Sequence, residues 1–190
     1  MKIAPFAREL GRHPDRFVHY LVHTGQHYDR AMSDSFWEDL GIPAPDENLG
    51  IGSGTHAEQV GRTMMAFEKT VKAWKPDWVV VVGDVNATCA ASITAKKEHV
   101  LLAHIEAGLR SFDRTMPEEI NRVVTDRLSD LLFTPDETAD RNLRNEGVPE
   151  TAIHRVGNIM IDTLEANRSK AARLSVEEIV AGNAVSGSAN

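Results

Sequence analysis

The sequence contains a single cysteine, Cys89, so it can form no internal disulfide and offers no cysteine pair for a structural zinc ion. No stretch approaches the roughly 18 unbroken apolar residues that a membrane-spanning helix needs. Charges at Lys2, Arg8 and Glu9 interrupt the continuous apolar core that a secretory signal requires. We therefore expect a cytoplasmic protein without a membrane span, whose fold depends on apolar burial.

Basic runs are also absent. Acidic side chains outnumber basic ones by 28 to 21, which gives a formal net charge of -7. Nucleic acid is therefore not an expected partner, because its phosphate backbone attracts clustered lysine and arginine. Individual arginines can still bind a phosphorylated small molecule, since local geometry decides that contact.

The 190 residues, 42% hydrophobic and 26% charged, are typical of one folded domain. Short apolar runs alternate with stretches of helical period, which predicts an α/β fold: a Rossmann-like parallel sheet with helices on both faces. The expected strands are Phe17–Val22, Trp78–Val82, Val100–Ile105, Asp130–Thr134 and Ala152–Val156, with Trp78–Val82 at the centre of the sheet because it is apolar throughout.

Helix boundaries are marked by specific signals. A capping box of Thr55 and Glu58 starts a long helix with one apolar face, and Pro76 stops it. Further helices are expected at Ile3–Leu10, Asn86–Lys97, Pro117–Ser129, Asp136–Glu146 and Asn158–Leu174, with an unstructured tail at Ala181–Asn190. A doubly wound domain ordinarily opens on a strand, so we expect the first strand to be missing before Ile3.

Polar residues that follow strands are the first site candidates, because ligands bind beyond the carboxyl ends of parallel strands. Asp84 and Asn86 follow the strand ending at Val82; the alternative is that one of them caps the next helix. Glu106 ends another apolar strand, where a carboxylate has no packing role. An ion pair with Arg110 is the alternative for Glu106.

The third candidate group lies at the start of the helix that begins with Pro117. Acidic residues are common in a first helical turn, so Glu118 has a structural explanation. At 100° per residue, however, Glu118, Arg122 and Thr125 share a side, and Glu118 and Arg122 are one turn apart and can pair. The apolar stripe on the other side is Ile120, Val123, Val124 and Leu128.

Together, Asp84, Glu106, Glu118 and Arg122 would place three acids and one planar cation around one crevice. Carboxylates in different environments hold different protonation states, as general acid and base chemistry on a sugar requires. His23 and His27 are better explained by ligand hydrogen bonding or loop structure than by metal binding, and no metal site is expected.

Several motifs together resemble the non-hydrolysing UDP-N-acetylglucosamine 2-epimerases, in order and spacing, from about Ile3 to Leu164. The motifs are Thr24-Gly25-Gln26-His27-Tyr28-Asp29, Gly52-Ser53-Gly54-Thr55-His56-Ala57-Glu58-Gln59, Gly83-Asp84, His104-Ile105-Glu106-Ala107-Gly108-Leu109-Arg110, Pro117-Glu118-Glu119-Ile120-Asn121-Arg122 and Val156-Gly157-Asn158.

The resemblance implies one half of a glycosyltransferase-B-type fold, in which two Rossmann-like domains face each other across a cleft. It implies interconversion of UDP-N-acetylglucosamine and UDP-N-acetylmannosamine by elimination and re-addition of UDP, without a cofactor. Asp84, Glu106 and Glu118 correspond to the catalytic acids and Arg122 to the supporting cation; which acid removes the proton stays open. The expected substrate contacts are Gln26, His27, Asn86 and Arg110.

Compared with the family pattern, we expect the first strand and the second domain to be missing. We expect residues 1–165 to form the amino-terminal domain and residues 166–190 a helical remnant and flexible tail. The isolated chain should then have little or no activity, because the domain that binds most of the UDP is missing. Two alternatives remain: a sugar transferase domain of the same fold, or a non-catalytic chain that forms a homodimer or pairs with a full-length epimerase. Related enzymes that act on diacetamido-uronic acid nucleotides leave the amide sugar open.

Overall fold

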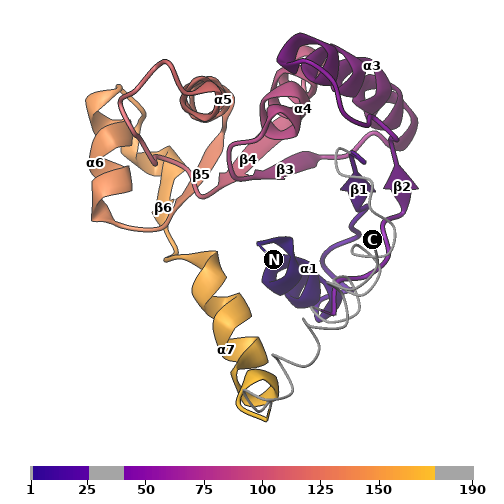
Figure 1. Cartoon of the computed structure of the whole chain (residues 1–190), viewed down its shortest axis with the longest axis vertical. Helices are drawn as coiled ribbons and strands as arrows, with labels where there is room; N and C mark the ends of the chain where they lie inside the picture. Colours follow the sequence, from indigo (N-terminus) through magenta and orange to yellow (C-terminus); the bar gives the residue numbers. More distant parts are fainter. Residues whose placement is uncertain (1, 26–40, 174–190) are drawn as a thin grey trace, which may run out of the picture.

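The computed structural model describes residues 2–25 and 41–173, which contain alternating helices and parallel strands (Figure 1). In chain order the elements are α1 (Ile3–Gly11), β1 (Val22–His23), β2 (Glu47–Asn48), α3 (His56–Trp74), β3 (Trp78–Val82), α4 (Asn86–Lys97), β4 (Leu101–Ile105), α5 (Pro117–Leu128), β5 (Leu131–Thr134), α6 (Glu137–Asn145), the 3-10 turn η1 (Glu150–Ala152), β6 (Ile153–Arg155) and α7 (Ile159–Ala171). The predicted α/β class is confirmed; the tail predicted at Ala181–Asn190 lies outside the described residues.

The main sheet contains four parallel strands in the order β3-β4-β5-β6. Val80 is opposite Ala103, Ala103 is opposite Leu131, and Leu132 is opposite Ile153. Because each crossover contains a helix, the carboxyl ends of β3 and β4 lie at the same edge of the sheet. That edge is where the candidate acids are attached.

Two clusters of buried apolar side chains support this sheet. The first joins α3 and α4 to β3 and β4 through Phe67, Val71, Val79, Ala95 and Leu102, among others. The second joins α6 to β5 and β6 through Leu132, Leu143 and Ile153. Cys89 is buried in α4, and burial raises the pKa of its thiol.

Two strand predictions are wrong in detail. β3 is an edge strand of the four-stranded sheet and not its centre, and Trp78 is 40% exposed. The strand predicted at Phe17–Val22 is reduced to Val22–His23, which pairs with the two-residue strand β2. The physical reason is the same in both cases: β1 pairs with β2 and not with β3, so apolar residues such as Val18 have no neighbouring strand to cover them.

The predicted helix boundaries of α3 are confirmed. Thr55 and Glu58 form the reciprocal capping box, and Lys75 ends the helix in a left-handed conformation, with φ 52°, directly before Pro76.

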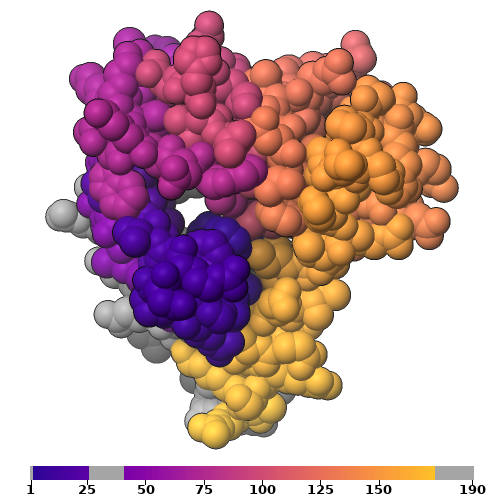
Figure 2. Space-filling model, turned by 180° about the vertical axis from the view of Figure 1, so that it is seen from behind, coloured from indigo at the N-terminus to yellow at the C-terminus, as the bar shows by residue number. Residues whose placement is uncertain are grey.

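Among the described residues, no helix is both long enough and apolar enough to cross a membrane. On the other side of the molecule, Figure 2 shows an opening between the indigo amino-terminal segment and the chain above it.

Candidate active site

The turn after β3 brings candidate groups from distant parts of the chain together. The Gly83 N–H donates to the Ile105 carbonyl at 3.1 Å, and Gly83 has a φ of 73°. A Cβ atom at Gly83 would lie 3.3 Å from Lys2 Nζ and 3.7 Å from Glu106 Oε2. Glycine therefore allows Lys2 and Glu106 to lie close to the backbone that carries Asp84.

Each of the two acids at the strand ends is paired with a cation. Arg122 NH1 is 2.8 Å from Asp84 Oδ2, and Lys2 Nζ is 2.5 Å from Glu106 Oε2. Glu106 also adopts a left-handed backbone conformation, with φ 71°, which is strained for a residue other than glycine. Lys2 is not among the site residues predicted from the sequence, since no motif or spacing marks it.

Glu119 is a second residue that the sequence analysis did not select. Its buried carboxylate accepts the N–H groups of Ser111 and Phe112, both at 3.0 Å, and Arg122 Nε at 2.9 Å. Burial alone would raise the pKa of Glu119, but these hydrogen bonds lower it below its usual value. The i,i+3 spacing of Glu119 and Arg122 could have identified this pair.

Arg122 therefore bridges Asp84 and Glu119, and it does not pair with Glu118 as its spacing had allowed. Glu118 is exposed and makes no hydrogen bond or ion pair within the described part of the chain. The structure thus brings Asp84, Glu106 and Arg122 together and leaves Glu118 without a contact to them.

The side of α5 that packs against the protein is polar. Of the residues in the predicted apolar stripe, Leu128 packs against the first apolar cluster, Val123 and Val124 are half-buried, and Ile120 is 46% exposed. The buried residues of α5 are Glu119, Asn121, Thr125 and Asp126. Glu119 and Asp126 accept backbone N–H groups from the segment that follows β4. Buried N–H groups need acceptors, so polar side chains are buried on this side of the helix.

Asn86 belongs to a group of neutral side chains beside Asp84. Its Nδ2 donates to Gln59 Oε1 at 2.7 Å and also lies 3.0 Å from Nδ1 of the His56 ring. Asn121 Nδ2 donates to the Asp84 carbonyl at 2.9 Å. The alternative in which Asp84 or Asn86 caps α4 is wrong, since the cap residue is Val85 and no side chain caps this helix.

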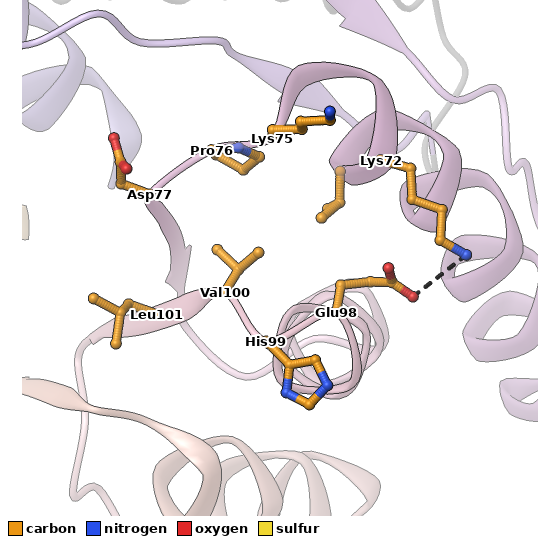
Figure 3. A pocket seen from close by; sticks show the side chains of 9 residues that line it. Lys72, Lys75, Pro76, Asp77, Glu98, His99, Val100 and Leu101 are labelled. Atoms are coloured by element: carbon orange, nitrogen blue, oxygen red, sulfur yellow. Dashed lines mark ion pairs between the residues drawn. The ribbon is translucent and has the colours of Figure 1, made fainter.

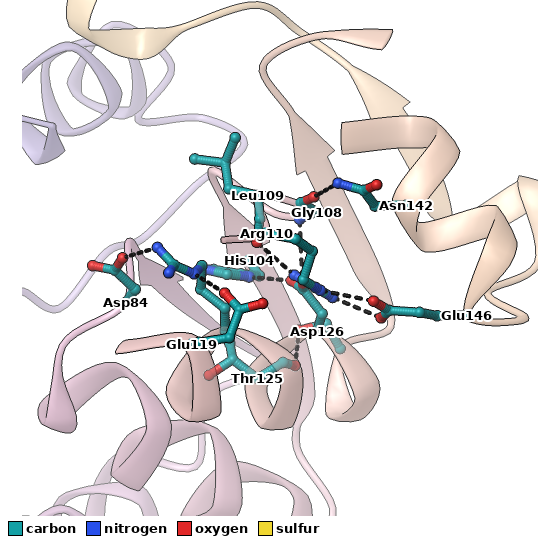
Figure 4. Close-up of polar contacts among 12 residues, drawn as sticks. Asp84, His104, Gly108, Leu109, Arg110, Glu119, Thr125, Asp126, Asn142 and Glu146 are labelled. Atoms are coloured by element: carbon teal, nitrogen blue, oxygen red, sulfur yellow. Dashed lines mark hydrogen bonds and ion pairs between the residues drawn. The ribbon is translucent and has the colours of Figure 1, made fainter. Parts of the chain in front are cut away.

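Arg110 lies in a buried polar network behind the strand ends (Figure 4). Its guanidinium contacts Asp126 and Glu146, each at 2.7 Å, and its side chain is 1% exposed. It is not the ion-pair partner of Glu106. Burial alone would lower the pKa of Arg110, but the two carboxylates raise it above its usual value. These contacts use the guanidinium and do not support a direct contact with substrate.

Gln26 and His27 lie outside the described residues, so their role stays a prediction. Within the described ranges, no three His, Cys, Asp or Glu side chains are grouped in a way that could hold a metal ion. A cavity of about 570 Å³ opens at the amino ends of β3 and β4, beside Lys72, Asp77 and His99 (Figure 3). It lies at the opposite end of these strands from Asp84 and Glu106.

This chain is similar to known proteins in sequence and in structure. Residues 8–186 match the family model described as UDP-N-acetylglucosamine 2-epimerase. A UDP-N-acetylglucosamine 2-epimerase homolog of Methanococcus maripaludis is 50% identical over 164 residues, which cover 86% of this chain and 45% of the relative. A UDP-2,3-diacetamido-2,3-dideoxy-D-glucuronate 2-epimerase of Pseudomonas aeruginosa is 52% identical over 145 residues, covering 75% and 41%.

Among solved structures, the Methanocaldococcus jannaschii UDP-GlcNAc 2-epimerase in complex with UDP-GlcNAc and UDP superposes with a TM-score of 0.88 at 45% identity, covering 92% of this chain and 48% of that one. The chain thus spans about half the length of the curated relatives that it matches. It belongs to the UDP-N-acetylglucosamine 2-epimerase family.

Proposed function

We propose that this chain supplies the carboxylate half of an enzyme that epimerises a UDP-linked 2-acetamido sugar at C2. The observation that carries the proposal is the grouping of Asp84 and Glu106, each beside a cation, around the Gly83 turn. UDP-N-acetylglucosamine is the proposed substrate, because it is named for the relatives that match most of this chain.

In the proposed reaction, a carboxylate removes the C2 proton while the bond from C1 to the UDP oxygen breaks. A double bond forms between C1 and C2, and a proton then returns to the opposite face of C2 as UDP adds back. Arg122 and Lys2 orient the carboxylates of Asp84 and Glu106 through their ion pairs. Glu118, which is exposed one turn before Arg122 on α5, is a third candidate to hold or deliver a proton.

The test combines this chain with the carboxyl-terminal half of the Methanocaldococcus jannaschii enzyme and follows UDP-N-acetylglucosamine in D₂O by proton NMR. We expect the mixture to form the C2 epimer with deuterium at C2, and each half alone to give little or no turnover. Binding energy from the UDP is needed to orient the sugar, so the chain alone lacks the means to position it.

Asp84→Asn and Glu106→Gln should each lower turnover of the mixture by roughly 10²-fold or more, the usual contribution of an acid or base. Glu137→Gln, on the exposed first turn of α6, is the matched control and should leave turnover unchanged. Equal rates for all three variants would refute the assignment of the acids. Release of UDP that requires an added acceptor would instead indicate a sugar transferase.

A second candidate function is that of a non-catalytic partner which pairs with another epimerase chain. The observation that favours it is a set of exposed apolar side chains on and before α7: Val156, Ile161 and Leu164. Apolar side chains grouped in this way are typical of a surface that another domain covers. Association with a full-length relative, without any gain in turnover, would support this second function.

A further inference from the structure

His104 is the fourth of the five residues of β4 and is completely buried, although buried strands normally carry apolar residues. Each of its ring nitrogens faces an oxygen atom: Nδ1 is 2.6 Å from Asp126 Oδ1, and Nε2 is 2.8 Å from the Gly83 carbonyl oxygen. A carbonyl oxygen can only accept a hydrogen bond, so Nε2 must carry a hydrogen.

Asp126 has the contacts of an ionised carboxylate. Its Oδ2 accepts the Gly108 N–H at 3.0 Å and Arg110 NH1 at 2.7 Å. An adjacent guanidinium stabilises the charged form of a carboxyl group. The remaining oxygen, Oδ1, therefore accepts from His104, and Nδ1 must also carry a hydrogen. With hydrogens on both nitrogens, the ring of His104 is a cation.

The surrounding charges balance this buried cation. Figure 4 shows a chain in which positive and negative groups alternate: His104, Asp126, Arg110 and Glu146. Glu146 binds the guanidinium of Arg110 through both oxygens, at 2.7 Å each, and is the only one of the four that solvent reaches to a large extent. Buried charges persist only when they are paired and hydrogen-bonded, and this arrangement meets that requirement.

The chain of charges connects the elements that carry the candidate acids. His104 holds the carbonyl of Gly83, the residue before Asp84, and Asp126 holds the N–H of Gly108, two residues after Glu106. Asp126 itself lies on α5, one turn beyond Arg122. Neither His104 nor Asp126 contacts the side chain of Asp84 or Glu106, so any effect on these acids must act through the backbone.

We propose that His104 and Asp126 are positioning residues: a buried imidazolium–carboxylate pair that fixes the Gly83 carbonyl and the Gly108 N–H and so sets the placement of Asp84 relative to Glu106. The positioning role rests on the proposed function, in which Asp84 and Glu106 are catalytic. The charge state of His104 is independent of that function, and it can be measured without turnover.

The first test is nitrogen NMR of the histidine rings in this chain near neutral pH. We expect one ring with hydrogens on both nitrogens, assigned to His104 because its signals disappear in His104→Gln. A wild-type His104 with either nitrogen unprotonated would overturn the proposal. If His104→Gln does not fold, assignment proceeds by replacing the other histidines one at a time.

Asp126→Asn provides an independent test. An asparagine has one oxygen, which Gly108 N–H and Arg110 both require, so its NH₂ group turns toward His104. Nδ1 must then accept, and the ring becomes neutral with its hydrogen on Nε2. We expect the Nδ1 signal to move to the unprotonated range while Nε2 keeps its hydrogen. Unchanged ring signals in a folded Asp126→Asn protein would contradict the proposal.

The positioning role is tested by the backbone signals of Gly83 and Asp84 and by kinetics. Asp126→Asn should shift the Gly83 carbonyl carbon and the Asp84 amide, whereas Ser92→Ala, which removes an equally buried hydroxyl bonded within α4, should not. In the active mixture described above, kcat should fall by roughly 10-fold to 100-fold with KM nearly unchanged, as small misplacements of catalytic groups do. Shifted signals with an unchanged kcat would refute the positioning role. A mixture without any turnover would count against the proposed function alone. In that case the NMR results would still decide the charge state of His104.

Discussion

Thr125 is completely buried on α5, next to Asp126, and its hydroxyl oxygen has no hydrogen-bond partner within the described residues. Burying an unpaired hydroxyl costs about 1–3 kcal/mol. Thr125→Val keeps the shape of the side chain and removes the hydroxyl. We expect it to raise the free energy of unfolding by about 1 kcal/mol, measured by denaturant unfolding.

The matched control for this change is Thr94→Val in α4. Thr94 is equally buried, but its hydroxyl donates to the Ala90 carbonyl at 2.9 Å, so its removal should leave stability unchanged or lower it. If Thr125→Val lowers the free energy of unfolding, the hydroxyl of Thr125 has a partner, and the inference of an unpaired group is wrong.

At the scale of single residues, the sequence could locate the acids and not their partners. Asp84 and Glu106 were found because parallel strands direct the residues after them to one edge. Lys2 was missed because its contact with Glu106 joins positions about a hundred residues apart, and no local pattern encodes such a pairing. His104 carried a usable signal, a polar residue inside an apolar strand, which indicates a buried polar contact.

At the scale of elements, α3 ends on a residue whose backbone conformation favours glycine. Lys75 has φ 52°, and its N–H donates to the Val71 carbonyl at 2.8 Å, a bond that glycine would keep. Lys75→Gly should raise the free energy of unfolding by about 0.5–1 kcal/mol. Lys97→Gly, at an ordinary helical position at the end of α4, should lower it by a similar amount. Denaturant unfolding of the two variants checks both signs, and a loss of stability in Lys75→Gly would contradict the argument.

Asp140 joins three elements of the carboxyl-terminal part of the domain. Its buried carboxylate accepts from Thr134 of β5 and from Arg155 of β6, with Arg155 NH2 at 2.7 Å. Burial alone would raise the pKa of Asp140, but these donors lower it below its usual value. A carboxyl group whose pKa is lower in the folded protein stabilises the fold above its unfolded pKa, and this contribution is lost as the pH falls through the folded value.

We therefore expect wild type to be more stable than Asp140→Asn by a constant margin above about pH 5. The margin should shrink as the pH falls below about 4, where the carboxyl group takes up a proton in the unfolded chain while Asp140 in the folded protein is still ionised. Thermal unfolding of both proteins across this range measures the effect. Glu137→Gln, which replaces an exposed carboxylate on the same helix by an amide, is the matched control. A margin that grows toward low pH would reverse the sign and refute the assignment.

Capping residues and prolines predicted the ends of helices well, whereas the spacing of apolar residues was a poorer guide to which side of a helix is buried. The capping box of Thr55 and the stop at Pro76 fix α3 through their own hydrogen bonds and sterics. The apolar stripe of α5 accounts for Leu128, which packs against the first apolar cluster, but it does not predict the burial of Glu119 and Asp126. These two carboxylates are buried because they accept backbone N–H groups of the segment between β4 and α5. β2, two polar residues long, has no pattern by which it could be found.

At the scale of the whole molecule, the α/β class could be predicted because alternating strands and helices dictate a parallel sheet. The place of β3 at the edge of the sheet could not, since it depends on β1 pairing with β2 and not on β3's own composition. The chain spans about half the length of the relatives that it matches, and α7 carries exposed apolar residues.

This exposure leads to a prediction about association. Ile161 and Leu164 lie one turn apart on α7 and are 57% and 65% exposed, so replacing them should not disturb the folded core. If the other half of an epimerase covers them, Ile161→Lys with Leu164→Lys should weaken binding to the carboxyl-terminal half of the Methanocaldococcus jannaschii enzyme at least tenfold. That change corresponds to about 1.4 kcal/mol and is measurable by calorimetry.

The control must add charge to the same helix without removing apolar surface. Glu165→Lys changes the net charge by the same amount as the double variant and lies at an exposed polar position of α7. We expect it to bind like the wild type, and both proteins to keep their circular dichroism spectra. Equal weakening by the control would mean that charge, and not apolar contact, governs the association. Unchanged binding by the double variant would mean that α7 lies outside the interface, because burying two lysines there would carry a large desolvation cost.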